Sequence, residues 1–236
     1  MTRKICKLIL ISVIFFQAVA GQEKEYKPQT VNLNIIAGIS LQNLKGTDFW
    51  GEKLENKVLL GYNAGFMTDI LIYRNLHFLP GLLYSAKGAR KELVEMVKKS
   101  DEGKVITSIR LSYLEIPVNF LYRPKLGEGH ILLGFGPYAA YGIGGKVKTK
   151  GSGYSNGIPV SFKNTVTIDD PSDYAYYRAL DVGMNLSFGY ELYNGIFCHL
   201  NLQMGLLEVN PRYEQLSNDK TSYKNRGFGL MFGYRF

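Results

Sequence analysis

Apolar side chains recur at every second position in eight segments of this chain, and this alternation constrains the fold more than any other feature. Successive side chains of a β-strand point to opposite faces, so each segment is predicted to be a strand with one apolar face. We expect these strands at residues 31–40, 58–70, 75–85, 106–122, 130–142, 176–192, 196–207 and 227–236.

The connections between these segments alternate strictly between short and long. The short ones are 71–75, 123–129 and 193–195, and the long ones are 41–57, 86–105, 143–175 and 208–223. This order is typical of a membrane barrel, with tight turns on one side and long loops on the other. We therefore expect an all-β, eight-stranded antiparallel up-and-down transmembrane β-barrel at residues 31–236. Its short turns and both termini are predicted to be periplasmic, and its long loops extracellular.

The polar faces of the segments indicate which side of the barrel meets lipid. They carry mostly Asn, Gly, Ser and Gln, whereas Lys and Glu gather in long connections such as 87–104. A soluble barrel needs a charged exterior, but small and uncharged polar side chains suit a narrow lumen. The sequence therefore predicts a polar interior and an apolar, lipid-facing exterior.

The first residues are predicted to be a cleaved signal peptide, residues 1–20. Basic residues precede an apolar run at 8–16, and the small residues 18–20 fit a cleavage site. Residues 21–30 would then form a short periplasmic segment before the barrel. The formal charge of +8 includes Arg3, Lys4 and Lys7, so it falls to +5 without the signal peptide. This lower charge argues against nucleic acid as a partner.

No motif in the chain indicates catalysis, a cofactor or a metal site. His77, His130 and His199 lie in different hairpins without metal-binding spacing, and no nucleophile motif or phosphate loop occurs. The glycine-rich stretch 134–145 lies in a strand that runs into a loop, which is the wrong context for a dinucleotide site. We therefore predict no catalytic, cofactor-binding or metal-binding residues.

Charged side chains on the predicted inner faces form a candidate lumen network. They either line a passage for ions or pair with one another inside a barrel too narrow to conduct, and the small interior of an eight-stranded barrel favours pairing. We expect Glu115 to pair with Arg235. The candidates are Asp69, Glu115, Asp181, His199 and Arg235.

The long connections are the expected sites of specific interactions. The longest, 143–175, is the candidate for binding an envelope protein partner. Connection 86–105 forms either an extension of its hairpin or a short helix. Lysines of the long connections pair with lipopolysaccharide phosphates or are simply solvated.

Four stretches resemble the outer-membrane β-barrel family of Gram-negative bacteria that includes PorT-like proteins. The most specific is YLEIPVNFLY at 113–122; the others are GLLYSAKGA at 81–89, LDVGMNLSFGYEL at 180–192 and the closing GYRF at 233–236. The resemblance covers nearly all of the chain after the signal peptide. It implies an eight-stranded outer-membrane barrel, and some members of the family belong to the type IX secretion apparatus.

The carboxy-terminal strand carries a second implication of the resemblance. Tyr234 and Phe236 resemble the terminal signal that the barrel-assembly machinery reads during insertion, whereas the simpler interpretation is a lipid-facing strand with interfacial aromatics. Taken together, these observations predict a non-enzymatic outer-membrane barrel with a structural or loop-mediated interaction role, in contact with outer-membrane lipid. The alternatives are a PorT-like component of a secretion or envelope-assembly machine, then a lipid-modifying barrel enzyme or a small-solute porin.

Overall fold

The computed structural model describes residues 31–97, 101–151, 154–216 and 218–236. The predicted signal peptide at 1–20 and the segment at 21–30 lie outside the described residues. None of the described residues forms a helix long and apolar enough to cross a membrane.

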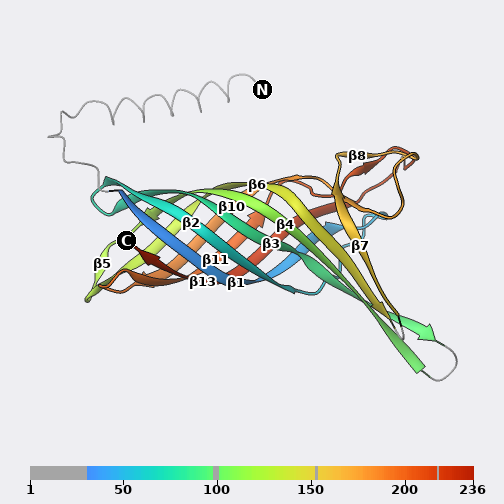
Figure 1. Ribbon diagram of the computed structural model, residues 1–236, viewed down its shortest axis with the longest axis horizontal. Helices are drawn as coiled ribbons and strands as arrows, with labels where there is room; N and C mark the ends of the chain where they lie inside the picture. Colours follow the sequence, from blue (N-terminus) through green and yellow to red (C-terminus); the bar gives the residue numbers. More distant parts are fainter. Residues whose placement is uncertain (1–30, 98–100, 152–153, 217) are drawn as a thin grey trace, which may run out of the picture.

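Eight antiparallel strands close into a ring (Figure 1). Each pairs with its neighbour in the order below, and the last pairs with the first, so the ring leaves no free edge along the barrel wall. The strands are β1 (Val31–Thr47), β2 (Leu59–Tyr73), β3 (Leu76–Val97), β4 (Asp101–Tyr122), β6 (Gly129–Gly151), β10 (Leu180–Glu191), β11 (Ile196–Gly205) and β13 (Ser222–Arg235). The predicted eight-stranded up-and-down barrel is confirmed.

The three short connections lie together at one end of the barrel, which we call the turn end. Two of them follow β2 and β10, and the third contains β5 (Lys125–Leu126). The start of β1 lies at the same end, where the Phe236 amide donates to the Leu33 carbonyl at 2.9 Å. The long connections lie at the opposite end, the loop end.

Strand pairing at the loop end extends further than the alternation predicted. β3 and β4 stay paired up to Val97 and Asp101, so connection 86–105 is a hairpin extension, and the alternative of a short helix is wrong. β6 likewise continues to Gly151 and pairs with β7 (Tyr154–Phe162). These four strands project beyond the rest of the barrel (Figure 1).

The remaining long connections are tied to one another. β8 (Thr165–Val166) pairs in parallel with β12 (Arg212–Tyr213), and β9 (Ala175–Tyr177) pairs in parallel with β7. Thr47 Oγ1 donates to the Lys220 carbonyl at 2.6 Å. Connection 143–175, predicted as one long loop, is therefore largely strand. It is joined to connection 208–223, which in turn is joined to connection 41–57.

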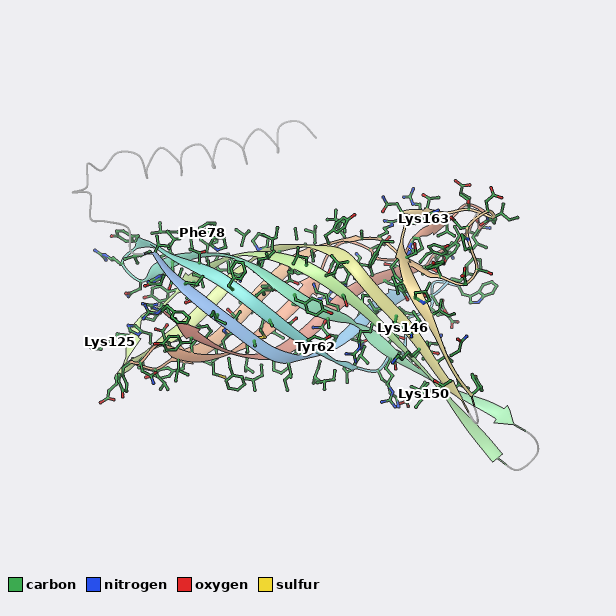
Figure 2. All side chains as sticks on the ribbon, in the orientation of Figure 1. Tyr62, Phe78, Lys125, Lys146, Lys150 and Lys163 are labelled. Carbon is green, nitrogen blue, oxygen red and sulfur yellow. The ribbon has the colours of Figure 1, made fainter. Side chains whose placement is uncertain are left out.

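The two faces of the wall have the predicted polarity. Apolar side chains cover the outside (Figure 2), whereas Asn34, Ser40, Asn185 and Gln203 are buried inside. Exposed outward side chains include Ile35, Ile39, Leu60, Phe66, Ile116, Phe135, Leu186, Phe188, Leu202 and Phe232. An apolar exterior around a polar interior is the arrangement that lipid requires.

Glycines make room for large aromatic rings inside the narrow lumen. Gly183 lies directly opposite Tyr138, and a Cβ at Gly183 would come within 2.6 Å of that ring. Gly233 is placed in the same way beneath Phe197, at 2.2 Å. The abundance of glycine and aromatic residues in the sequence thus follows partly from the need to fill a tube of fixed width.

Candidate functional site

The interior of the barrel is built in layers, and each layer takes one inward position from several strands. Along β1 the buried inward side chains run from the turn end to the loop end in the order Asn34, Ile36, Ser40, Gln42 and Leu44. Side chains of the other strands contribute to the same polar and apolar levels. The lumen is therefore a candidate functional site.

A group of charged side chains closes the turn end; we call it the turn-end cluster. Asp69 accepts from His77 Nδ1 at 2.5 Å and from Arg123 at 3.2 Å. Glu191 binds Arg235 through Nη2 at 2.7 Å and lies 3.5 Å from Arg123. Two carboxylates and two guanidinium groups therefore balance one another at the mouth of the barrel.

An apolar layer lies above the turn-end cluster. Its members come from seven strands and pack as one group. They are Ile36, Met67, Leu79, Leu121, Leu132, Phe197 and Met231.

A small cavity extends through the lumen from the turn-end cluster, past the apolar layer, to Glu115 and Gln203, and both polar and apolar side chains line it. Its volume is about 70 Å³, which is room for a few water molecules. Ser85 donates to Asn63 at 2.7 Å, and Asn63 and Gln42 both donate to Ser40, so a neutral chain crosses three strands on one side. His199 also lines the cavity and stacks on Phe197.

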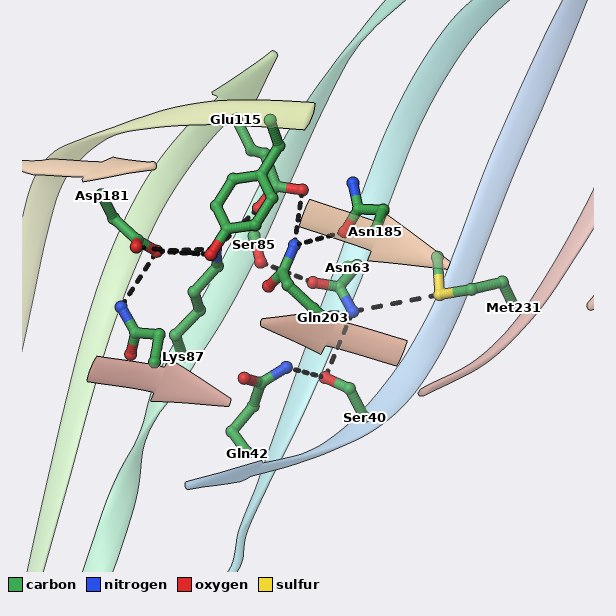
Figure 3. Close-up of polar contacts among 12 residues, drawn as sticks. Ser40, Gln42, Asn63, Ser85, Lys87, Glu115, Asp181, Asn185, Gln203 and Met231 are labelled. Atoms are coloured by element: carbon green, nitrogen blue, oxygen red, sulfur yellow. Dashed lines mark hydrogen bonds and ion pairs between the residues drawn. The ribbon is translucent and has the colours of Figure 1, made fainter. Parts of the chain in front are cut away.

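A second ionic group, the loop-end cluster, lies deeper, between the cavity and the loops (Figure 3). Lys87 is fully buried and binds Asp181 at 2.9 Å and Glu115 at 2.8 Å. Asn225 donates to Asp181 at 3.0 Å, and the Lys87 ammonium lies 4.1 Å from the centre of the Tyr138 ring. One cation thus holds two buried carboxylates.

Neutral amides complete the environment of Glu115. Gln203 Nε2 donates to Glu115 at 2.9 Å and to Asn185 at 3.1 Å. A buried carboxylate needs hydrogen bonds as well as a counter-charge, because desolvation otherwise outweighs the attraction between the ions. Above the cluster an apolar cap seals the lumen; it consists of Leu44, Ala89, Leu111, Tyr113, Tyr138, Ala140, Tyr177 and Val209.

The structure divides the predicted lumen network between three levels. Asp69 and Arg235 belong to the turn-end cluster, Glu115 and Asp181 to the loop-end cluster, and His199 to the cavity between them. The predicted pairing of Glu115 with Arg235 is wrong. The two residues lie at opposite ends of the lumen, where Lys87 and Glu191 take their places as partners.

Several members of the clusters were missed from the sequence. Lys87 lies in a predicted long connection, but it shares its parity with the inward residues Leu83 and Ser85, and that parity is a usable signal. Arg123 lies in a predicted short connection. His77 and Glu191 lie in predicted strands, but their partners depend on strand register, which alternation alone does not give.

Metal-binding side chains are not concentrated anywhere in the part of the chain that the structure describes. No group of three or more His, Cys, Asp or Glu residues is placed to hold a metal ion there. Cys198 is a half-buried free thiol. The lumen carboxylates are engaged by cations and amides, so the arrangement supports filling and rigidity of the barrel.

The loop end combines order with exposed apolar side chains. Trp50 is 76% exposed and Ile168 is 83% exposed. An ion pair between Lys163 and Asp170 supports the segment around Ile168, and it lowers the pKa of Asp170 while raising that of Lys163. Trp50 and Ile168 are therefore candidate contact residues on this ordered surface.

The last strand places Tyr234 and Phe236 on the outer surface at the turn end. Both are exposed, and their rings meet edge to face with centroids 4.8 Å apart. This position is that of an interfacial aromatic girdle. A role in recognition by the assembly machinery stays a prediction.

Comparison with known proteins identifies a family and similar solved structures, of which two are described. A family model described as "Outer membrane protein beta-barrel domain" matches residues 20–210. One similar structure is that of Ail, the attachment invasion locus protein of Yersinia pestis, in complex with the heparin analogue sucrose octasulfate. Its sequence is 14% identical to this chain and the TM-score is 0.39. The match covers 87% of this chain and 99% of the Ail chain. A second structure of Ail is 12% identical with the same TM-score, covering 87% and 98%. None of the curated proteins compared with the chain matches it.

Proposed function

This chain belongs to the outer membrane protein β-barrel domain family, and we propose that it acts there as a non-enzymatic barrel whose loop end binds an envelope partner. The loop end is the proposed binding surface and faces the cell exterior. The barrel wall and the filled lumen give that surface a rigid base.

The filled lumen argues against a small-solute porin. Two ionic clusters and two apolar layers occupy the interior, and the cavity that they leave is only about 70 Å³. An eight-stranded barrel is only wide enough for its own side chains, whereas conducting porins have 16–18 strands. We expect no single-channel steps from the protein in planar bilayers.

The observation that carries the proposal is that strand pairing and hydrogen bonds link the long connections to one another. The pairing of β8 with β12 joins connection 143–175 to connection 208–223. The Lys220 amide donates to the Phe49 carbonyl at 3.4 Å, which joins connection 208–223 to connection 41–57. Ordering this much chain has an entropic cost that a merely solvating loop would not need to bear. The ordered surface nevertheless leaves Trp50 and Ile168 exposed.

A crosslinking pull-down from native outer membranes tests the proposal. The variant is Trp50→Ser with Ile168→Ser in a tagged protein, and the matched control is Tyr193→Ser, which removes an aromatic ring that is 78% exposed at the turn end. A partner captured by the wild type and the control, but not by the loop variant, supports the proposal. Equal capture by all three proteins, or no capture at all, contradicts it.

The alternative is a PorT-like component of a secretion or envelope-assembly machine. Such a component would also use its periplasmic end, where Tyr193 and Leu126 are exposed. In the same pull-down this function predicts a partner that is lost with Tyr193→Ser and kept with the loop variant. Deletion of the gene would then cause a secretion defect. A lipid-modifying enzyme is removed as an alternative if expression leaves the mass of lipid A unchanged.

Insertion by the barrel-assembly machinery is proposed to depend on Tyr234 and Phe236. Both lie on the exposed face of the strand that closes the ring. Deletion of Phe236 should lower the amount of protein in the outer membrane while leaving refolding in detergent unchanged. An unchanged outer-membrane yield would show that the two aromatics serve only as lipid-facing side chains.

A further inference from the structure

Basic side chains gather on the outer surface of β4 and β6, on the loop-end side of the apolar band. Arg110 of β4 lies directly opposite Lys146 of β6. Figure 2 shows Lys146 and Lys150 on the wall beyond Tyr62, toward the projecting strands. We call this surface the β4–β6 basic face; its exposed members are Arg110, Lys146, Lys148 and Lys150.

A β-bulge turns these lysines outward. The register of β4 against β6 shifts between Ser112 and Tyr113, which leaves Ile143 as an extra residue on β6. An extra residue reverses which side chains of a strand face outward. As a result Val147 packs against the apolar cap, while Lys146 is exposed. Without the bulge, the lysines would point into the sealed mouth of the lumen.

The face begins where aromatic rings end the apolar band. Arg110 donates to the Leu60 carbonyl at 3.4 Å, and the ring of Tyr62 stacks on Tyr84 with centroids 5.6 Å apart. Tyr141, which is 62% exposed, lies on β6, the strand next to β4. Tyrosines in such positions mark the boundary between hydrocarbon and headgroups. Arg110 and Lys146 therefore lie at the level of lipid headgroups.

The two central cations have no acidic partner in the part of the chain that the structure describes. Glu92, on the adjacent strand β3, is bound by Lys57 and Arg90. Like charges placed directly opposite each other across a strand pair destabilise the sheet. Arg110 and Lys146 are thus arranged to share an anion from outside the chain.

We propose that the β4–β6 basic face binds a phosphate of a phosphorylated glycolipid in the outer leaflet, with Arg110 and Lys146 as its main ligands. A guanidinium group binds phosphate through two parallel hydrogen bonds, and an ammonium group beside it adds a point charge. The acyl chains of the same lipid would lie against the apolar band below. This inference requires no protein partner and is independent of the loop-end interaction.

Photo-crosslinking at a single position tests the proposal. A photoreactive amino acid replaces Tyr141 in the full-length barrel, which is reconstituted into vesicles of phosphatidylcholine containing bisphosphorylated lipid A. The test variant carries Arg110→Gln with Lys146→Gln, and the matched control carries Lys125→Gln, an exposed lysine at the turn end. Migration on unheated gels checks that every variant is folded.

Loss of both cations should lower the yield of crosslinked lipid A by about tenfold or more, while Lys125→Gln leaves it unchanged. Dephosphorylated lipid A should crosslink no better than phosphatidylcholine. Equal yields from wild type and test variant, or from phosphorylated and dephosphorylated lipid, overturn the proposal. Displacement of the lipid by millimolar inorganic phosphate also overturns it, because the site would then take free phosphate rather than a lipid headgroup.

Discussion

The two ionic clusters of the lumen differ in their exposure to solvent and in their balance of charge. The turn-end cluster lies at the mouth of the barrel, where 23% of the Arg235 side chain is exposed. In the loop-end cluster the Lys87 and Asp181 side chains are fully buried, and a single cation serves two carboxylates. The first cluster is balanced in charge and opens to solvent at the mouth, whereas the second is enclosed within the barrel and holds one more carboxylate than cations.

This difference indicates at which end of the barrel the loss of an ion pair should lower the stability more. Removing one partner of a buried ion pair leaves an uncompensated charge out of reach of water, which costs far more than the net gain from forming the pair. At the mouth, water and a second guanidinium group take over part of the role of a lost partner. The same kind of ion pair should therefore matter greatly at one end and modestly at the other.

The largest effect is expected from Lys87→Met. It leaves Asp181 and Glu115 buried without a cation and should lower the free energy of unfolding by about 3–5 kcal/mol. Urea unfolding in detergent micelles measures the change. Adding Glu115→Gln and Asp181→Asn removes the stranded charges and should restore more than half of the loss. A single variant as stable as the wild type would show that the cluster does not hold the barrel together.

A smaller effect is expected from Gly183→Ala, which disturbs the same region by steric means alone. The added Cβ would lie 2.6 Å from the Tyr138 ring and 2.2 Å from the Met204 carbonyl oxygen. Overpacking of this kind costs about 1–3 kcal/mol. Gly144→Ala is the matched control, because nothing lies within 4 Å of its added Cβ. Equal stability of the two variants in urea would mean that Tyr138 moves aside freely.

Arg235→Gln probes the other side of the comparison. It removes the contacts of Nε and Nη2 with Glu191, but Arg123 stays 3.5 Å from that carboxylate. We expect a loss of about 1–2 kcal/mol in the same urea experiment. A loss as large as that of Lys87→Met would remove the proposed difference between the loop-end cluster and the turn-end cluster.

The smallest effect concerns an ion pair outside the barrel, between Lys163 and Asp170. The pKa of Asp170 is lowered from about 3.8, so its contribution is present above that pH and is lost as the pH falls through the lower, folded value. The pKa of Lys163 is raised from 10.5, so its contribution is lost only above that pH. Thr167 donates its amide to Asp170 at 2.9 Å, and hydrogen exchange of this amide reports on the pair.

Protection of the Thr167 amide should therefore stay constant between pH 4 and 10 after correction for the intrinsic exchange rate, and it should fall below pH 3.8. Asp170→Asn should remove the protection at every pH without moving the urea midpoint of the barrel. A loss of protection near pH 6 would contradict this assignment, because neither group of the pair titrates there.

The prediction from sequence worked best where a single strand carries the information. Alternation placed the apolar side chains of β1, β10 and β13 outside and Asp69, Glu115 and Asp181 inside, because the side chains of a strand have a fixed period of two. It also found all eight strands of the ring. It ended β3 too early and began β4 too late, since polar residues at 87–104 hide a hairpin that continues beyond the barrel.

Pairing inside the lumen required the tertiary structure. Glu115 and Arg235 were both correctly assigned to the interior, but a strand's height in the barrel depends on its register with every neighbour around the ring. Lys87 shows the same limit. Its parity predicts an inward side chain, but only the strand register places it beside Asp181, which lies 94 positions further along the chain.

The sequence by itself thus determined that this protein is a barrel with an apolar exterior, because facing lipid imposes a repeating pattern on every strand. Only the tertiary structure decided that the lumen holds two separate ionic clusters, that a bulge turns Lys146 outward, and that the long connections are tied together. These features depend on distances between strands that are far apart in sequence, and no local period encodes such distances.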